Sequence, residues 1–287
     1  MSYRRRTSPL HAARAAASSS YCAALGVVAL ALDHPLVLAT LVLVLLTAGG
    51  AAGAGREIGR AALYSAPLAG VIAIVNALVT RDGLSVVVRL GQLPILGHTD
   101  ITLEATAYGG VLGLRAIALI LCGALYTTAV DPDEVLRLFR RISFRSALSA
   151  SIATRLVPVL ARDARRLADA QRCRPGRPPS RLQLLRAAST GALERALDVA
   201  AALEVRGYGS ARRPLAARRP WARADAAFFF SAIALVALAV AARAIPLAPF
   251  RAYPSLYAPV GPRELVLAVA LGLIALLPFA LRRGLER

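Results

Sequence analysis

Two arginines at the ends of long helix-like runs have the types and spacing that could do specific chemistry in this chain. Arg174 lies in AQRCRPGR and Arg206 follows 32 residues later in LEVRGYGS. Each is followed at once by Pro-Gly or Gly, which end helices. A guanidinium group presents a planar fork of donors that pairs with carboxylate or phosphate oxygens. Anion binding at two helix ends is therefore one chemistry that the pair could perform.

Three interpretations of this pair are open from the residues alone. The arginines can complement the negative C-terminal ends of their helices, with Gly207 as the residue after the second cap, for about 0.3–1 kcal/mol each. They can belong to a basic amphipathic surface that lies on anionic lipid. They can also enter acidic grooves of a partner protein, where removal of one member of a buried ion pair costs about 3–5 kcal/mol.

The acidic stretch DPDE, which starts at Asp131, offers a second candidate chemistry. Its acids could bind Mg²⁺ in a membrane-embedded enzyme of lipid or prenyl transfer, but such a site needs another acid-rich motif, and the sequence has none. Asp131 suits a helix N-cap, Pro132 suits the first helical position, and Glu134 completes a capping-box-like pattern. We expect a capped helix here and keep the membrane enzyme as the alternative function.

No group of residues predicts a catalytic or metal site. The three cysteines stand far apart without C-x-x-C spacing, and His98 with Asp100 lacks a third ligand, so we expect a polar loop there. All 35 basic residues are Arg, so the Lys of a Walker motif is missing. We therefore expect no enzyme, no cofactor in this chain and, without an aromatic stacking platform, no nucleic-acid binding.

The elements that must position these residues are those of a membrane protein. Apolar residues make up 57% of the chain and charged residues only 18%, against about 25% in soluble domains. Six apolar segments are predicted, at 21–32, 36–48, 63–79, 102–130, 225–249 and 263–281. The first two are shorter than the roughly 20 residues that cross a bilayer, so they form short spans or a tight membrane hairpin.

The placement of arginines predicts which side of the membrane each segment lies on. If both termini are cytoplasmic, 29 arginines lie in cytoplasmic segments and three lie outside, as the positive-inside rule requires. We therefore expect a multi-pass membrane protein with both termini in the cytoplasm. Arg115 lies within the segment 102–130, where a charge is costly. It is expected either to pair within the protein or to brace a helix at a partner interface.

Residues 131–224 interrupt the membrane pattern with 20 arginines and eight acidic residues. Leucine spacing predicts amphipathic helices over 147–174, kinked at Pro158, and over 181–206, joined by the stiff turn RPGRPPS. The expected fold is an all-α membrane protein with these two helices in a cytosolic insert. Its predicted domains are 1–130 with about four spans, 131–224 in the cytosol, and 225–287 with two spans.

Over most of its length the chain resembles the transmembrane T component of energy-coupling factor (ECF) transporters, the EcfT/CbiQ family. The likeness rests on SAPLAGVIAIVNAL, GLRAIALILCGALYTTAVDPDEV, TRLVPVLARDARRLADAQRCRPG and ALDVAAALEVRGYG, which follow in the family's order and spacing. The family's two Ala-Arg-Gly-like signatures stand here as Cys173-Arg174-Pro175 and Val205-Arg206-Gly207. Both arginines are kept, whereas the first signature lacks its glycine.

The resemblance implies a non-catalytic subunit of an ECF-type ABC importer for a vitamin or a transition-metal ion. In such transporters two ATPases bind ATP and Mg²⁺, a small membrane S component binds the substrate, and the T component couples them. Arg174 and Arg206 would contact opposite ATPase subunits. The resemblance places the protein in a prokaryotic plasma membrane and leaves the substrate open, because another subunit recognises it.

Overall fold

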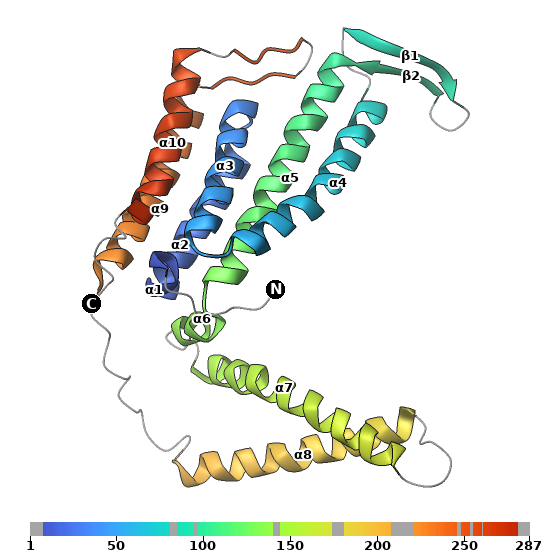
Figure 1. The fold of residues 1–287 in the computed structure, drawn as a ribbon, viewed down its shortest axis with the longest axis vertical. Helices are drawn as coiled ribbons and strands as arrows, with labels where there is room; N and C mark the ends of the chain where they lie inside the picture. The colour runs from blue at the N-terminus through green and yellow to red at the C-terminus, as the bar shows by residue number, and fades with distance from the viewer. Residues whose placement is uncertain are drawn as a thin grey trace. The chain divides into compact units, whose positions relative to one another are not determined.

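The computed structural model describes residues 8–80, 85–93, 97–139, 144–173, 181–207, 221–245, 248–252, 255–259 and 261–280. Two compact units are present: Met1–Val135 with Trp221–Arg287, called here the membrane unit, and Leu136–Pro220, called the two-helix unit. The elements of the described residues are α1 (Pro9–Ala12), α2 (Ala15–Ala31), α3 (Pro35–Ala51), α4 (Gly55–Val79), β1 (Val86–Leu93), β2 (Gly97–Thr102), α5 (Leu103–Ala129), α6 (Pro132–Phe139), α7 (Phe144–Arg172), α8 (Arg181–Val205), α9 (Arg223–Ala244) and α10 (Pro262–Ala280) (Figure 1).

The membrane unit is a bundle of apolar helices (Figure 1). Four of them, α4, α5, α9 and α10, are long and apolar enough to cross a membrane. The helices α2 and α3 have 17 residues each, or about 25 Å, which is near the lower limit for a span. A multi-pass helical membrane protein is therefore confirmed, whereas the count of six spans stays a prediction.

The core of this bundle forms where α2, α3, α5, α9 and α10 meet. Its members include Leu25, Leu41, Leu121, Phe228 and Leu271, each with 0% of its surface exposed. Because these side chains come from helices that are far apart in the sequence, the core joins the segments before and after the two-helix unit. The membrane unit is thus one packed body.

The helix α4 is held mainly by close packing against α5. A β-carbon at Gly109 would lie 2.8 Å from the Ala73 carbonyl oxygen, and one at Gly113 would lie 2.9 Å from that of Ala69. Only glycine admits this approach of the two backbones, in the small-xxx-small pattern of membrane helices. The opposite side of α4 exposes large apolar side chains such as Leu63 and Ile74, as expected of a surface that faces lipid or another membrane protein.

A two-stranded antiparallel hairpin corrects the all-α expectation. Val88 pairs with Ile101 and Arg89 with Asp100 between β1 and β2. The β-branched run at 86–88 favours a strand, and pairing with β2 provides the partner that a single strand lacks. The polar loop expected around His98 and Asp100 is therefore wrong, since both residues lie on β2.

The two-helix unit consists chiefly of α7 and α8, which pack against each other in antiparallel directions. Leu167 and Gln171 near the end of α7 share a cavity with Gln183, Leu184 and Ala187 near the start of α8. Of the residues between 136 and 207 whose burial the structure describes, none is buried. These side chains therefore form no closed core between the two long helices.

Candidate functional site

The first arginine signature is placed only in part. Helix α7 ends at Arg172, and the Cys173 N–H donates to the Asp169 carbonyl oxygen at 3.2 Å. The Cys173 thiol is free and exposed. Arg174 and Pro175 lie outside the described residues, so their predicted contact with a partner stays a prediction.

The second signature is described in full at the end of α8. Val205 is the last helical residue and is 90% exposed, and Arg206 is exposed beside it. Gly207 has φ of 75°, the left-handed conformation that a glycine after a helix end adopts most easily. Its N–H donates to the Glu204 carbonyl oxygen at 2.8 Å. The predicted helix end at Gly207 is confirmed, and the helix presents an apolar and a cationic side chain at its tip.

Helix α8 separates the two signatures by a fixed length. Gln171, two residues before the first signature, lines the same cavity as Gln183 at the start of α8, whereas the second signature ends this helix. At 1.5 Å per residue, Arg181 and Val205 are about 36 Å apart. Cys173 and Arg206 therefore lie near opposite ends of α8, too far apart for one compact anion site.

An ion pair that the sequence did not predict joins the two helices. Asp163 of α7 pairs with Arg195 of α8, and both side chains are a little more than one third exposed. Helical spacing places Asp163 on the same side of α7 as Leu156, Leu160 and Leu167, which are half-buried. A charge in the middle of an apolar stripe was the available signal for a partner on a neighbouring helix.

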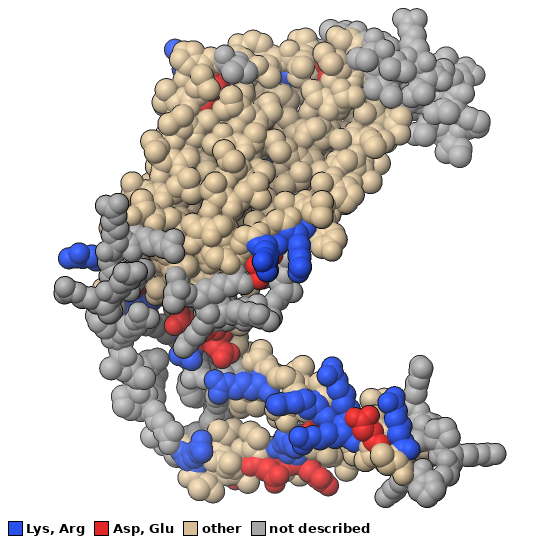
Figure 2. Space-filling view, in the orientation of Figure 1, with Lys and Arg blue, Asp and Glu red and all other residues tan. Residues whose placement is uncertain are grey.

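The outer surfaces of α7 and α8 differ in character. Arginines gather over α7, and acidic side chains lie along α8 (Figure 2). The exposed arginines of α7 are Arg155, Arg162, Arg165, Arg166 and Arg172. The exposed leucines of α8 are Leu182, Leu185, Leu193 and Leu197, each 58–64% exposed. The leucine stripe predicted for α8 therefore faces away from α7.

Arg115 is engaged inside the membrane unit, at the C-terminal end of α2. Its Nε donates to the Ala29 carbonyl oxygen at 3.1 Å and its Nη2 to that of Leu32 at 3.3 Å, and the same group pairs with Asp33. Arg243 of α9 adds a donor to the Ala31 carbonyl oxygen at 3.4 Å. These arginines satisfy carbonyl groups that a helix end leaves unpaired. A contact between Arg115 and a partner protein stays a prediction.

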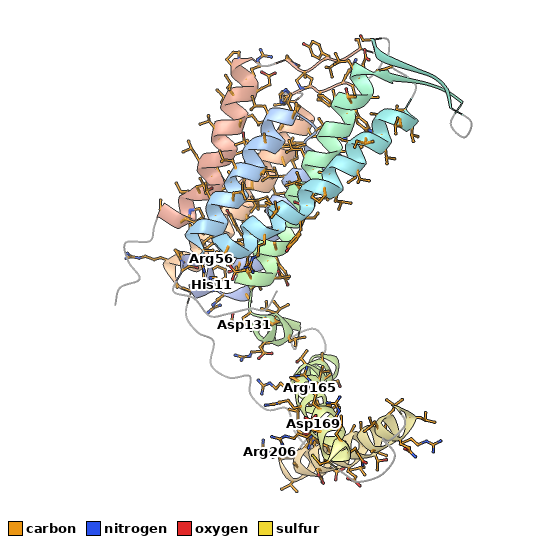
Figure 3. The ribbon with its side chains drawn as sticks, turned by 45° about the vertical axis from the view of Figure 1, so that its right-hand side comes forward. His11, Arg56, Asp131, Arg165, Asp169 and Arg206 are labelled. Atoms are coloured by element: carbon orange, nitrogen blue, oxygen red, sulfur yellow. The ribbon has the colours of Figure 1, made fainter. Side chains whose placement is uncertain are left out.

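The DPDE stretch caps a helix as predicted, with one difference. The Asp131 carboxylate accepts the Asp133 N–H at 2.9 Å, and Pro132 begins α6 (Figure 3). Glu134, expected to complete a capping box, accepts the Ala15 N–H at 3.0 Å and so contacts the first turn of α2. Sequence reasoning missed this contact because the two residues are 119 positions apart.

A second carboxylate reaches the same turn of α2. Asp225 of α9, 1% exposed, accepts the Arg14 N–H at 2.7 Å and the Ala222 N–H at 2.9 Å. The Arg14 guanidinium lies 3.5 Å from the same carboxylate and 5.6 Å from the centre of the Trp221 ring. Two acids from distant segments thus meet the two adjacent N–H groups at the start of α2. None of these residues was singled out for this role from the sequence.

Potential metal ligands do not cluster in the part of the chain that the structure describes. No group of three or more His, Cys, Asp or Glu side chains there could hold a metal ion. The Asp131 and Glu134 carboxylates, the candidates for a Mg²⁺ site, accept backbone N–H groups. Their geometry is that of helix caps.

Long apolar helices around a common core, with a separate unit of two exposed helices, define a multi-pass α-helical membrane protein. A family model described as cobalt transport protein, CbiQ, matches residues 7–215, which include both arginine signatures. The chain therefore belongs to the CbiQ family of cobalt transport proteins, as the resemblance indicated. No individually curated protein matches the chain.

Proposed function

We propose that this chain is the T component of an ECF-type importer, which joins two ABC-type ATPases to a membrane S component that binds the substrate. Membership of the CbiQ family supports a transport role. The observation that carries the coupling role is that no residue of the two-helix unit whose burial the structure describes is buried. Helices this long gain most of their stability from packing, so their exposed surfaces are suited to partner proteins.

The leucine side of α8 is the surface we assign to a partner with an apolar face. Burial of each leucine would contribute about 1.5–3 kcal/mol if its side chain were fully covered. Four such residues on one side of a helix form a helix-in-groove type of contact surface. The S component is the partner we assign to it.

The two arginine signatures are the contacts we assign to the ATPases. Cys173, the described residue of the first signature, and Arg206 lie near opposite ends of α8, a helix about 36 Å long, which suits two separate acidic grooves, one on each ATPase subunit. When the ATPases close around ATP and Mg²⁺, α7 and α8 would move with them and shift the S component. This chain performs no chemistry in that cycle.

The cargo and the setting follow from the same proposal. The description of the family favours cobalt as the transported ion, with other transition-metal ions and vitamins as the alternatives. We place the protein in a prokaryotic plasma membrane with six spans, both termini and the two-helix unit in the cytoplasm. The excess of arginine in the corresponding segments supports this orientation.

Co-purification from the native membrane tests the proposal. Wild-type chain should retain two ATPase subunits and a small membrane protein, whereas Arg174→Glu with Arg206→Glu should lose the ATPases, because both contacts become repulsive. Arg165→Glu is the matched control, since it reverses the charge of an exposed arginine of α7 that belongs to neither signature. Retention of the ATPases by the double variant, with substrate uptake unchanged, would refute the coupling role.

A further inference from the structure

The chain leaves the membrane unit after Val135 and re-enters it at Trp221, and acids close to both points contact the same turn of α2. The outgoing passage is α6, a continuous helix that crosses the boundary after Val135. Glu134, one residue before this boundary, holds the Ala15 N–H at 3.0 Å. The returning passage begins at Trp221, and Asp225, four residues later, holds the Arg14 N–H at 2.7 Å.

The start of α2 needs these two acids because it cannot cap itself. Its N-cap residue is Arg14, whose side chain has no acceptor and makes no cap hydrogen bond. The N–H groups of Arg14 and Ala15 would otherwise be unpaired at the positive end of the helix, where carboxylates are stabilising. A serine or aspartate at position 14 would accept the N–H of Ala16 or Ala17 and would leave those of Arg14 and Ala15 to other acceptors.

The distant acids do more than an ordinary cap would. Asp225 is 1% exposed and binds Arg14 through both the backbone and the guanidinium group, while Arg14 also lies over the Trp221 ring. The returning segment is therefore held at Trp221, Ala222 and Asp225 together. The outgoing helix is held through Glu134 at the next N–H along.

We propose that Glu134 and Asp225 are positioning residues, a carboxylate clamp that fixes the start of α6 and the start of α9 to the first turn of α2. The two acids lie shortly before and shortly after the two-helix unit in the sequence, so the clamp holds both chain connections at one place in the membrane unit. If the coupling role proposed above holds, on which this consequence rests, motion of α7 and α8 enters the membrane unit at the start of α2. Helix α2 then passes it to its neighbours, because its other end is held by Arg115 of α5.

A distance measurement on the full chain in lipid nanodiscs tests the clamp without any partner. Cys173 is an exposed native thiol, and Cys22 and Cys122 are buried, so one added cysteine at Gly59, where a β-carbon meets no atom within 4 Å, gives a pair of spin labels. Glu134→Ala with Asp225→Ala should broaden the distance distribution between the two labels. Glu134→Gln with Asp225→Asn, which keeps acceptor oxygens, should restore most of the wild-type width.

Amide hydrogen exchange gives the second readout on the same samples. The peptide that contains Arg14 and Ala15 should exchange about tenfold faster in the double alanine variant, as expected for loss of a helix cap. Asp198→Ala removes an exposed acid of α8 and should change neither readout. If the double alanine variant does not fold, Glu134→Ala alone is used, because Glu134 is only half-buried. An unchanged width and exchange rate in the folded variant would overturn the clamp.

Measurements on the assembled transporter then test the effect of the clamp on coupling and distinguish it from the proposed function. With the ATPases retained, the double alanine variant should hydrolyse roughly threefold more ATP per substrate imported, the size expected when a coupling element is weakened. A merely structural role would lower the amount of complex and leave this ratio unchanged. Failure of wild-type chain to bind ATPases would refute the proposed function but not the clamp, which the label distances test alone.

Discussion

The membrane unit and the two-helix unit contain similar proportions of leucine and alanine but use them in opposite ways. In the membrane unit, side chains such as Leu25 and Phe228 are fully buried between helices from both halves of the chain. In the two-helix unit, Leu193 and Leu197 are mostly exposed, and no residue whose burial is described there is buried. The difference shows that the first unit completes its packing within this chain, whereas the second has apolar surface left for other molecules.

The largest expected effect on stability comes from placing one charge in each unit, which tests the difference between the two. Leu121→Asp should prevent recovery of folded protein, because an unpaired carboxylate in the core costs more than about 4 kcal/mol. Leu193→Asp, at a residue 64% exposed, should leave the thermal unfolding of purified chain within roughly 0.5 kcal/mol of wild type. Size-exclusion chromatography and thermal unfolding in detergent measure both variants. Equal losses would mean that the two units do not differ in this way.

A smaller effect is expected where charges meet the end of α2. Arg115→Ala should lower the free energy of unfolding by about 1–3 kcal/mol, because the Ala29 and Leu32 carbonyl groups lose their donor. Arg243→Ala, at a side chain 70% exposed, should cost clearly less. Unfolding of purified protein by a denaturing detergent compares the two variants. A larger loss of stability for Arg243→Ala would show that Asp33 pairs mainly with Arg243 and not with Arg115.

Packing between α4 and α5 predicts opposite changes in stability when two neighbouring glycines are each replaced by alanine. Gly109→Ala should destabilise the protein by about 1–3 kcal/mol, since its β-carbon would lie 2.8 Å from the Ala73 carbonyl oxygen. Gly110→Ala meets no atom within 4 Å and should stabilise the helix by up to about 1 kcal/mol. Thermal unfolding of the two variants checks the signs. Stabilisation by both substitutions would mean that α4 and α5 are not this close.

The smallest effect concerns the link between α7 and α8. A double-mutant cycle on Asp163→Ala and Arg195→Ala should give a coupling energy of about 0–1 kcal/mol, because both side chains are partly exposed. The coupling should weaken further in high salt. Hydrogen exchange across α8 measures it in the purified chain. A coupling energy well above this range would indicate that α7 and α8 stabilise each other more strongly than the exposure of their side chains indicates.

Local sequence patterns predicted the features that depend on neighbouring residues, such as helix starts, caps and ends. Pro132 begins α6, Asp131 caps it, and Gly207 ends α8 in the left-handed conformation. The apolar segments located the membrane helices. The predicted segment 102–130 begins one residue before α5. These features depend on neighbours within a few residues, which a single sequence displays.

Contacts between distant residues could not be predicted in the same way. The acids that cap α2 lie 119 and 211 positions from their donors, and no spacing rule relates residues so far apart. The partner of Asp163 is 32 residues away on another helix, so a charge within an apolar stripe was the only sign of it. The hairpin was missed because its strands are short and its pairing, rather than an alternating pattern, stabilises them.

The two ends of α2 have a further consequence for how the protein meets its lipid. Carboxylates at the start and guanidinium groups at the finish replace the water that terminal peptide groups of a membrane helix ordinarily need. A helix satisfied in this way is not obliged to extend to either headgroup layer. In bilayers of different thickness, tilting and strain should fall on the longer α4 and α5, and α2 should keep its place.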